Sequence, residues 1–232
     1  MMVEEKITAL VPMRHHSERV PEKNFRPLAG KPLYAHILET LHACPEIGQI
    51  VVDTDSPVIV SGITERFPDV LLIDRPEHLR ADDVPMNDVL LHDVSQCEAE
   101  IYLQTHSTNP LLRARTVSDA ISAFRRGLPQ HDSLFSVTRL QTRLWDVDGK
   151  PINHDPSILL RTQDLKPVYE ENSCIYIFQR SVFVDRGNRI GRAPTMFEID
   201  AEEAWDIDEE FDFLIADRLM QERMRSQSEK NK

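Results

Sequence analysis

Residues 11 to 24 read Val-Pro-Met-Arg-His-His-Ser-Glu-Arg-Val-Pro-Glu-Lys-Asn and follow an apolar run that starts at Ile7. The apolar run is typical of a buried strand. In the basic loop that follows, Arg14, Arg19 and Lys23 offer an anion both forked guanidinium groups and a compact ammonium. A solvated loop with ordinary surface charges is the alternative. Its position favours a ligand site, because open parallel sheets bind ligands at the carboxyl ends of their strands.

The loop excludes two common phosphate-binding motifs. It lacks the glycine spacing of a dinucleotide fingerprint and of a Walker loop. Ser17 and Asn24 add neutral hydrogen-bond donors beside the charged groups. We therefore expect a phosphorylated ligand that is not a Rossmann dinucleotide.

Length and charge narrow the class of protein. A chain of 232 residues can form one large α/β domain with a proper core, and we expect a single domain over residues 1–232. The formal net charge is −12 and the pI is about 5.2, which argues against a nucleic-acid partner. A local basic site in an acidic protein suits a small anionic ligand.

Cysteine usage and hydropathy indicate the cellular setting. Cys44, Cys97 and Cys174 are odd in number and lack metal-ligand spacing, so we expect three buried thiols in a reducing compartment. The charged N-terminus predicts no signal peptide, and no apolar run approaches membrane-spanning length. The expected location is the cytoplasm, without a membrane partner.

Apolar runs and amphipathic segments alternate along the chain. We expect strands at residues 7–13, 47–53, 70–73, 101–104, 133–138, 174–178 and 196–199, and helices at 31–44, 57–67, 85–97, 113–126 and 209–225. The alternation predicts an α/β fold with a mostly parallel central sheet and helices on both faces.

Two segments break this alternation. Residues 139–171 mix charges with Trp145 and several prolines, which permits a long disordered loop. A structureless segment of that length is uncommon inside a compact domain, so we expect a small hairpin excursion that packs on something. Residues 226–232 are polar and are expected to be frayed.

Two Asp-x-Asp pairs compete for a metal. Asp206 and Asp208 precede the last predicted helix, and in an extended segment their side chains lean the same way. Two carboxylates with substrate phosphates suit Mg²⁺; acidic residues at a helix N-terminus are the alternative. Asp53 and Asp55 end the second predicted strand, where turn chemistry is the alternative. A metal-dependent glycosyltransferase using such a pair is therefore a rival function.

Other polar residues follow neighbouring strands. Arg75 comes after the third predicted strand and either lines the same cleft or forms an ordinary loop ion pair. Gln104 and the run from Ser107 to Asn109 follow the fourth strand and suit a polyhydroxylated ligand. Helix capping ahead of Arg113 is the alternative for this run.

Several motifs occur in a fixed order along nearly the whole chain. They are Arg14-x-x-Ser17-x-x-x-Pro21-x-Lys23-Asn24, Leu28-x-Gly30-Lys31-Pro32-Leu33, Thr54-Asp55, Arg75-Pro76, Arg161-x-Gln163-Asp164, Tyr169-x-x-Asn172 and Trp205-Asp206-Ile207-Asp208. Together they resemble the acylneuraminate cytidylyltransferase family, the CMP-sialic acid synthetases. Arg19-Val20-Pro21 is similar instead to the related CMP-Kdo synthetases.

The resemblance implies a fold and a reaction. It implies a Rossmann-like nucleotidyltransferase fold and a homodimer formed through a protruding subdomain, here residues 139–171. The implied reaction transfers CMP from CTP to a nine-carbon keto-sugar acid and releases pyrophosphate. The anomeric hydroxyl attacks the α-phosphorus, and a metal with Arg and Lys stabilises the charge that develops.

The resemblance also implies roles for individual residues. These are triphosphate binding by Arg14 and Lys23, cytidine positioning by Ser17, Asn24 and Arg75, Mg²⁺ binding by Asp206 and Asp208, and sugar binding by Gln104, Tyr169 and Asn172. The phosphate-binding and metal-binding groups together form the expected catalytic set.

The chain departs from the family pattern within the loop and near the sugar. His15, His16, Glu18 and Arg19 differ from the usual loop, and Arg189-Ile190 stands where an aromatic pair is typical. The acceptor is therefore the least transferable feature, and a sialic-acid-like sugar acid is the expected class. The alternatives are a metal-dependent glycosyltransferase or other sugar nucleotidyltransferase, and a non-catalytic nucleotide-binding relative.

Overall fold

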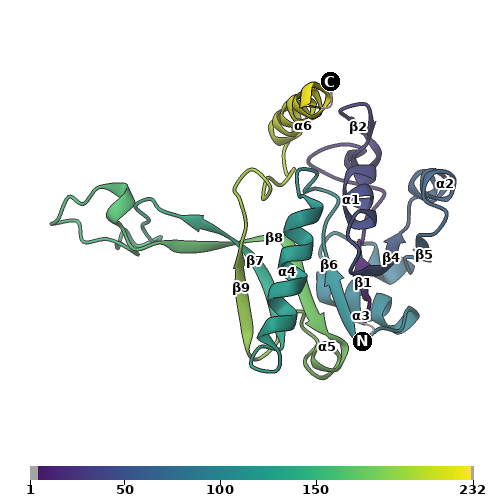
Figure 1. The fold of residues 1–232 in the computed structure, drawn as a ribbon, viewed down its shortest axis with the longest axis horizontal. Helices are drawn as coiled ribbons and strands as arrows, with labels where there is room; N and C mark the ends of the chain where they lie inside the picture. Colours follow the sequence, from purple (N-terminus) through teal and green to yellow (C-terminus); the bar gives the residue numbers. More distant parts are fainter. Residues whose placement is uncertain (1–4, 231–232) are drawn as a thin grey trace.

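A seven-stranded sheet forms the centre of the computed structural model, which describes residues 5–230 (Figure 1). Its strand order is β5-β4-β1-β6-β8-β7-β9. The strands are β1 (Ile7–Leu10), β4 (Ile47–Thr54), β5 (Leu71–Asp74), β6 (Ile101–Gln104), β7 (Ser133–Leu140), β8 (Val168–Gln179) and β9 (Pro194–Glu198). A separate two-stranded sheet pairs β2 (Pro27–Leu28) with β3 (Lys31–Pro32).

Six α-helices connect the strands in the part of the chain that the structure describes. They are α1 (Leu33–His42), α2 (Pro57–Arg66), α3 (Met86–Gln96), α4 (Ala114–Gly127), α5 (Arg180–Arg186) and α6 (Glu210–Lys230). Three short 3-10 helices are η1 (Lys23–Phe25), η2 (Glu77–Leu79) and η3 (Thr162–Asp164). No helix among the described residues is long and apolar enough to cross a bilayer.

The sheet is mostly parallel, as the alternating pattern predicted. Strand β1 pairs in parallel with β4 and β6, and β4 pairs in parallel with β5. Strand β8 runs antiparallel to both β6 and β7, while β9 is parallel to β7. The direction reverses at β8 because this strand enters the sheet directly after a hairpin rather than after a crossover helix.

Helices cover both faces of the sheet, which confirms the predicted fold class. Successive strand residues point to opposite faces. Ala9 and Val52 pack with residues of α1, α2 and α4, whereas Leu10 and Val51 pack with residues of α3 and α5. The two cores leave the carboxyl ends of β1, β4 and β6 at a common edge, where the basic loop leaves β1.

Local sequence explains where the helices begin. The helix α1 follows Pro32, as predicted, and buries Leu33, Ile37 and Leu41 along one stripe. The helix α2 begins with Pro57 in its first turn, and the Ser56 hydroxyl accepts a hydrogen bond from the Ile59 N–H at 3.3 Å.

The excursion predicted over residues 139–171 is an arm that projects from the sheet (Figure 1). Its base continues β7 and β8, which remain paired out to Leu140 and Val168. Between them the arm contains a bridge from Trp145 to Pro151 and the short helix η3. The paired base agrees with a hairpin rather than with a long disordered loop. The packing of the arm on another surface stays a prediction.

Short elements and one helix end differ from the sequence prediction. The β2–β3 pair and α5 were not predicted, because two-residue strands and a seven-residue helix are too short to show a period. The helix α6 continues through residues 226–230, where a frayed tail was predicted, since Gln, Glu and Lys favour helix. Residues 231–232 of that predicted tail lie outside the described residues.

Candidate active site

The basic loop lines a cleft of about 350 Å³ at the carboxyl edge of the sheet. Every predicted residue of the phosphate and cytidine groups borders it. The lining comprises Pro12, Met13, Arg14, His16, Ser17, Glu18, Arg19, Lys23, Asn24, Arg75, Asp82, Met86, His106, Ser107 and Thr108. The loop thus forms one wall, and residues that follow β5 and β6 form the others.

Lys23 joins the basic loop to the far end of the chain. Its ammonium donates a hydrogen bond to the Ile207 carbonyl at 2.6 Å. Burial lowers the pKa of Lys23, while the carboxylates of Asp206 and Asp208 act to raise this pKa. The ammonium therefore lies beside the predicted metal-binding carboxylates and at the border of the cleft.

Arg19 makes a second connection between the two ends of the chain. Its guanidinium donates to Asp208 Oδ1 at 2.6 Å and lies 3.7 Å from Glu209 Oε1. Arg14, on the same loop, forms an ion pair with Asp82. Both guanidinium groups are partly exposed, so an incoming anion can exchange with these carboxylates at modest cost.

Asn24 braces the loop from inside. Its side-chain N–H donates to the Arg14 carbonyl at 2.7 Å, and its oxygen accepts a hydrogen bond from the Ser107 hydroxyl at 2.7 Å. Asn24 is buried, whereas Ser17 borders the cleft. The direct cytidine contact expected for Asn24 remains a prediction.

His15, whose role the sequence did not explain, ties the loop to the end of β4. Its backbone N–H donates to Asp55 Oδ1 at 2.7 Å, and its ring nitrogen Nδ1 lies 2.7 Å from the Ser56 hydroxyl. The ring also stacks on Phe25, with centroids 5.5 Å apart. These contacts fix the loop above the sheet.

The two carboxylates of the first Asp-x-Asp pair have separate partners. Asp53 is completely buried and accepts a hydrogen bond from the Arg75 guanidinium, which is only 2 % exposed. Asp55 holds the basic loop through His15. Arg75 therefore lies in the floor of the cleft, and the Asp53 carboxylate balances its charge.

The second pair lies before α6 and does not cap it. Asp212 provides the cap, because its carboxylate accepts hydrogen bonds from the N–H groups of Asp208 and Glu209 at 3.1 and 2.8 Å. The Ile207 N–H donates to the Thr108 carbonyl at 3.0 Å, which holds this segment against the loop after β6. The alternative interpretation, in which these carboxylates complement the dipole of α6, and the metal-site interpretation both stay predictions.

Asp206 has an oxygen available for a ligand. Its Oδ1 is buried and has no hydrogen-bond partner among the described residues. Burial raises the pKa of Asp206, and a hydrogen bond from Thr108 acts to lower this pKa. A buried carboxylate oxygen without a donor fits a hard cation, so the donor set agrees with the Mg²⁺ predicted for Asp206 and Asp208.

A second hollow of about 470 Å³ adjoins these carboxylates. It is lined by Thr138, Glu170, Glu171, Asn172, Ser173, Ala201, Ala204, Trp205, Asp206, Asp208 and Asp212. Of the predicted sugar-binding residues, only Asn172 lies here. Its side chain accepts a hydrogen bond from Ser136 at 2.6 Å and donates to Thr138 at 2.9 Å.

The other two predicted sugar-binding residues are not in this hollow. Gln104 is fully buried at the end of β6 and donates to the Thr105 carbonyl at 3.1 Å. Tyr169 lies in the arm, is 39 % exposed and borders neither hollow. The structure therefore brings the nucleotide and metal predictions together more completely than the sugar predictions.

Arg189 is a residue of this region whose contacts the sequence did not reveal. Its guanidinium donates to Gln104 Oε1 at 2.5 Å and lies 3.6 Å above the centre of the Tyr176 ring. Burial, with the charges of Arg189 and Lys23, lowers the pKa of His106 to about 3, so this imidazole is neutral. The sequence signal that marked Arg189 was its departure from the family pattern, in which an aromatic residue is typical at this position.

The sheet with its basic loop and late carboxylate pair defines a nucleotidyltransferase-like site. The family model described as cytidylyltransferase matches residues 8–230, and the chain belongs to this family.

Relatives and solved structures agree with this family. The chain is 26 % identical over 230 residues to post-translational flagellin modification protein B of Campylobacter coli, covering 94 % of this chain and 96 % of that protein. It is 24 % identical to N-acylneuraminate cytidylyltransferase A of Danio rerio, covering 91 % of this chain but only 50 % of that protein. The fold matches CMP:2-keto-3-deoxy-manno-octonic acid synthetase, solved with CTP, with a TM-score of 0.69, 17 % identity and coverage of 94 % and 99 %.

Proposed function

We propose that this protein transfers CMP from CTP to a sialic-acid-like keto-sugar acid and releases pyrophosphate. The observation that carries the proposal is the position of Lys23, whose ammonium binds the Ile207 carbonyl between Asp206 and Asp208. This contact joins the predicted phosphate-binding loop to the predicted metal-binding pair. Membership of the cytidylyltransferase family and the names of the relatives support CTP and a sugar acid as substrates.

The cationic side chains of the cleft suit a nucleophilic displacement at phosphorus. The anomeric hydroxyl oxygen forms a bond to the α-phosphorus and loses its proton, while the bond to the bridging oxygen of pyrophosphate breaks. Negative charge grows on the leaving oxygens, and Arg14 and Lys23 stabilise this charge. Ser17 and Arg75, which border the same cleft, position the cytidine part, and Asn24 supports the loop that carries them.

Asp206 and Asp208 would hold Mg²⁺. The unpartnered Oδ1 of Asp206 and the partly exposed carboxylate of Asp208 support this assignment. Bound there, Mg²⁺ would neutralise phosphate charge as the leaving group departs. Arg19, which pairs with Asp208, would then release that carboxylate to the metal and turn toward the phosphates.

The acceptor would lie near the second hollow. Asn172 borders this hollow. The sialic-acid class is supported by the N-acylneuraminate cytidylyltransferases among the relatives. The hydroxyl groups of such a sugar would find hydroxyl, amide and carboxylate partners on the hollow's wall.

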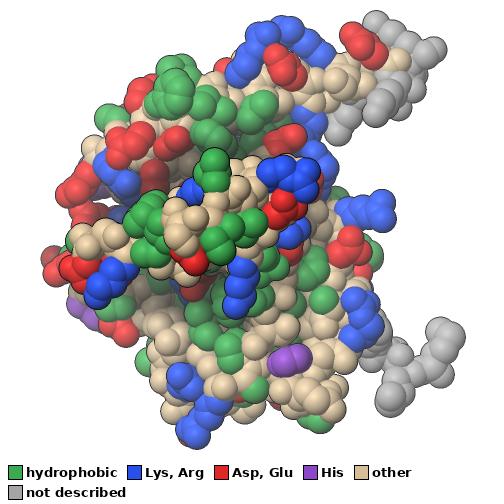
Figure 2. Space-filling model, turned by 90° about the vertical axis from the view of Figure 1, so that its left-hand side faces the viewer, with side chains coloured by type: hydrophobic (Ala, Val, Ile, Leu, Met, Phe, Trp, Pro, Cys, Tyr) green, Lys and Arg blue, Asp and Glu red, His purple; other side chains and the backbone are tan. Residues whose placement is uncertain are grey.

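The arm would form a homodimer. It exposes large hydrophobic side chains that a second copy could cover, namely Trp145, Val147, Ile152, Ile158, Leu159, Leu160 and Tyr169. Figure 2 views the molecule from the side on which the arm projects and shows hydrophobic side chains gathered across this face. An exposed apolar surface of this kind marks an interaction site.

One assay tests the reaction. The protein is incubated with each nucleoside triphosphate, Mg²⁺ and a panel of keto-sugar acids, and pyrophosphate release is followed. We expect release with CTP and one class of acid, with a CMP-sugar product. Cleavage of nucleotide-sugars without pyrophosphate would indicate a glycosyltransferase, and tight CTP binding without turnover would indicate a non-catalytic relative.

A second measurement tests the dimer. Leu159→Asp places a charge on the exposed tip of the arm, where the side chain is 89 % exposed, so the monomer fold should be unaffected. Sedimentation of the native protein should show a dimer and that of the variant a monomer. Val58→Asp, at an exposed hydrophobic position on α2, is the matched control. A native monomer would contradict the proposal.

A further inference from the structure

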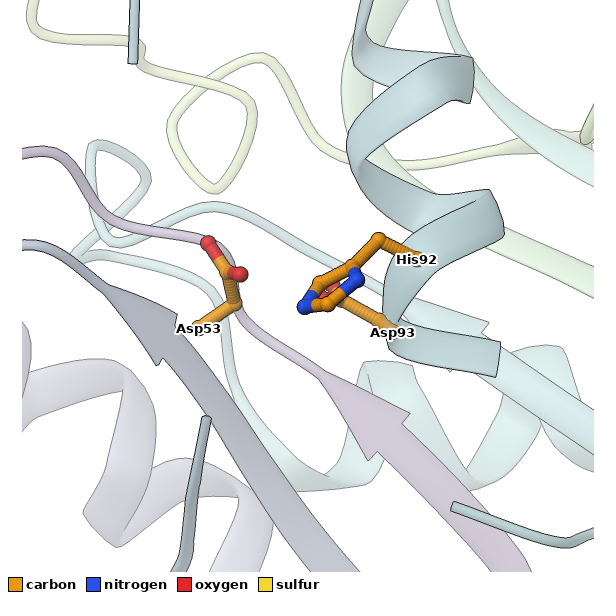
Figure 3. Close-up of side chains that lie close together, drawn as sticks. All are labelled: Asp53, His92 and Asp93. Atoms are coloured by element: carbon orange, nitrogen blue, oxygen red, sulfur yellow. The ribbon is translucent and has the colours of Figure 1, made fainter. Parts of the chain in front are cut away.

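A buried cluster of ionisable groups lies beneath the nucleotide cleft and has no part in the proposed chemistry. Figure 3 shows Asp53 at the end of β4 facing His92 and Asp93 of α3. One ligand atom of each residue lies within 4.8 Å of the others. Asp53 and Asp93 are 0 % and 1 % exposed, so water cannot solvate them. Arg75 completes the cluster through its bond to Asp53.

Each member of this cluster has a polar atom without a partner among the described residues. These buried atoms are Asp53 Oδ2, Asp93 Oδ1, His92 Nε2 and Arg75 Nη2. Two carboxylate oxygens that face one another without a donor repel strongly in a medium of low dielectric constant. The pair therefore needs a proton or a cation between its oxygens.

The charge balance favours a proton. Arg75 neutralises one carboxylate, so two ionised aspartates beside a neutral His92 imidazole would leave one negative charge in the interior. One added proton removes this charge, whereas a divalent cation would leave an excess positive charge next to the Arg75 guanidinium. Cys97 adds no charge, because burial raises the pKa of its thiol to about 11 and its sulfur donates to the Asp93 backbone carbonyl at 3.1 Å.

We propose that Asp53 and Asp93 share one proton, and that Asp93 is a positioning residue that acts through Asp53 on the Arg75 guanidinium in the floor of the cleft. The neutral Asp93 carboxyl donates its proton toward Asp53 Oδ2. This bond fixes the rotation of the Asp53 carboxylate, whose other oxygen accepts from Arg75. Only the nucleotide-binding readout of this inference rests on the proposed function.

The direction of the Asp93 pKa agrees with a shared proton. Burial raises the pKa of Asp93 to about 9, and the nearby Asp53 charge adds to the increase. Burial also raises the pKa of Asp53, against the opposing effect of the Arg75 charge. Above about pH 9 the second carboxylate ionises, and its charge repels phosphates that approach Arg75.

The same shift has a defined effect on stability. The folded-state pKa of Asp93 is raised, so its contribution to stability is greatest below the ordinary aspartate pKa and is lost as pH rises toward about 9. Asp93→Asn keeps a donor for Asp53 and removes the titration. We therefore expect the variant to gain Tm relative to the native protein as pH rises. The Tm difference between the two proteins, variant minus native, should be roughly 5–10 °C larger at pH 8.5 than at pH 5.5.

Nucleotide binding gives a second readout. The affinity for CTP is measured by calorimetry between pH 7 and pH 10 for the native protein, Asp93→Asn and Asp93→Leu. The native affinity should fall about tenfold above pH 8, and that of Asp93→Asn should stay level. Asp93→Leu, which cannot donate, should bind CTP about fivefold more weakly at every pH.

Several outcomes would overturn the inference. Equal behaviour of the Asn and Leu variants would show that no donated proton is needed, and a level native profile in both CTP affinity and relative Tm would show that none is shared. Stoichiometric retention of Mn²⁺ or Zn²⁺ after dialysis, abolished by Asp93→Asn, would assign the cluster to a metal instead. Absence of CTP binding at all pH values would contradict the proposed function while the Tm comparison still tests the shared proton.

Discussion

Asp53-Thr54-Asp55 and Asp206-Ile207-Asp208 have the same spacing, yet their carboxylates have different surroundings. In the first pair, one carboxylate is buried against Arg75 and the other accepts the backbone N–H of His15. Asp53 and Asp206 each have a buried oxygen without a partner. Asp53 lies in the interior beside the Arg75 charge, whereas Asp206 borders a hollow and Asp208 is half exposed and paired with Arg19. The comparison teaches that spacing alone does not identify a metal site, because the neighbouring charges and the exposure of the two pairs differ.

The largest effect is expected at the second pair. Asp206→Asn or Asp208→Asn should lower kcat of cytidylyl transfer by about 10²- to 10³-fold, because each removes charge from the proposed metal site. Circular dichroism should be unchanged. Asp119→Asn on α4 is the control, since that carboxylate is 62 % exposed. Near-native turnover in both variants would contradict the assignment of Mg²⁺ to Asp206 and Asp208.

The first pair should matter chiefly for folding. Asp53→Ala leaves the buried Arg75 charge without its partner, and we expect the free energy of unfolding to fall by about 3 kcal/mol in urea titrations. Asp119→Ala again provides the surface control. A loss below about 1 kcal/mol would mean that Arg75 is solvated from the cleft and does not depend on Asp53.

Substitution of Lys23 tests whether its ammonium, which lies beside Asp206 and Asp208, binds the outer phosphates of CTP. Lys23→Ala should weaken CTP binding by about 10- to 100-fold and CMP binding much less, because the ammonium is expected to reach the outer phosphates. Isothermal titration with both nucleotides measures this ratio. Lys150→Ala in the exposed part of the arm is the control. Equal weakening of both nucleotides would place Lys23 away from the outer phosphates.

The smallest effect is expected at Asp55. Asp55→Ala removes the acceptor of the His15 N–H and should cost about 1 kcal/mol of local stability. Hydrogen exchange at the His15 amide should accelerate, while kcat changes by less than about threefold. A large loss of turnover with slow exchange retained would instead give Asp55 a direct role in the reaction.

The central fold was predictable because its signals are local. Continuous apolar runs marked β1 and β4, and helical spacing marked α1 with Pro32 at its start. The alternation of strands and helices predicted a parallel sheet. The basic loop was therefore expected at the carboxyl ends of its strands. Strand β8 was predicted only from Cys174, because its first six residues form the polar base of the arm.

The partners of the site residues were less predictable because they depend on contacts across the sheet. Asp53 meets Asp93, which lies 40 positions later on α3, and no local pattern marks that pairing. Gln104 meets Arg189 because β6 and β8 place Tyr176 opposite it in the ladder. Residue type and spacing predicted the nucleotide-binding groups; the ion pairs and hydrogen bonds among them required the three-dimensional arrangement.

The contacts between the two ends of the chain have a consequence for synthesis in the cell. Lys23, Arg19 and the Ala29 backbone bond to Ile207, Asp208 and Asp217, at sequence separations of 184, 189 and 188 residues. A ribosome must therefore pass residue 217 before the basic loop and the β2–β3 segment can meet all these partners. Because such non-local contacts form late, a nascent chain would acquire its central sheet before it could trap a nucleotide. Catalytic competence would then report that translation of this region is complete.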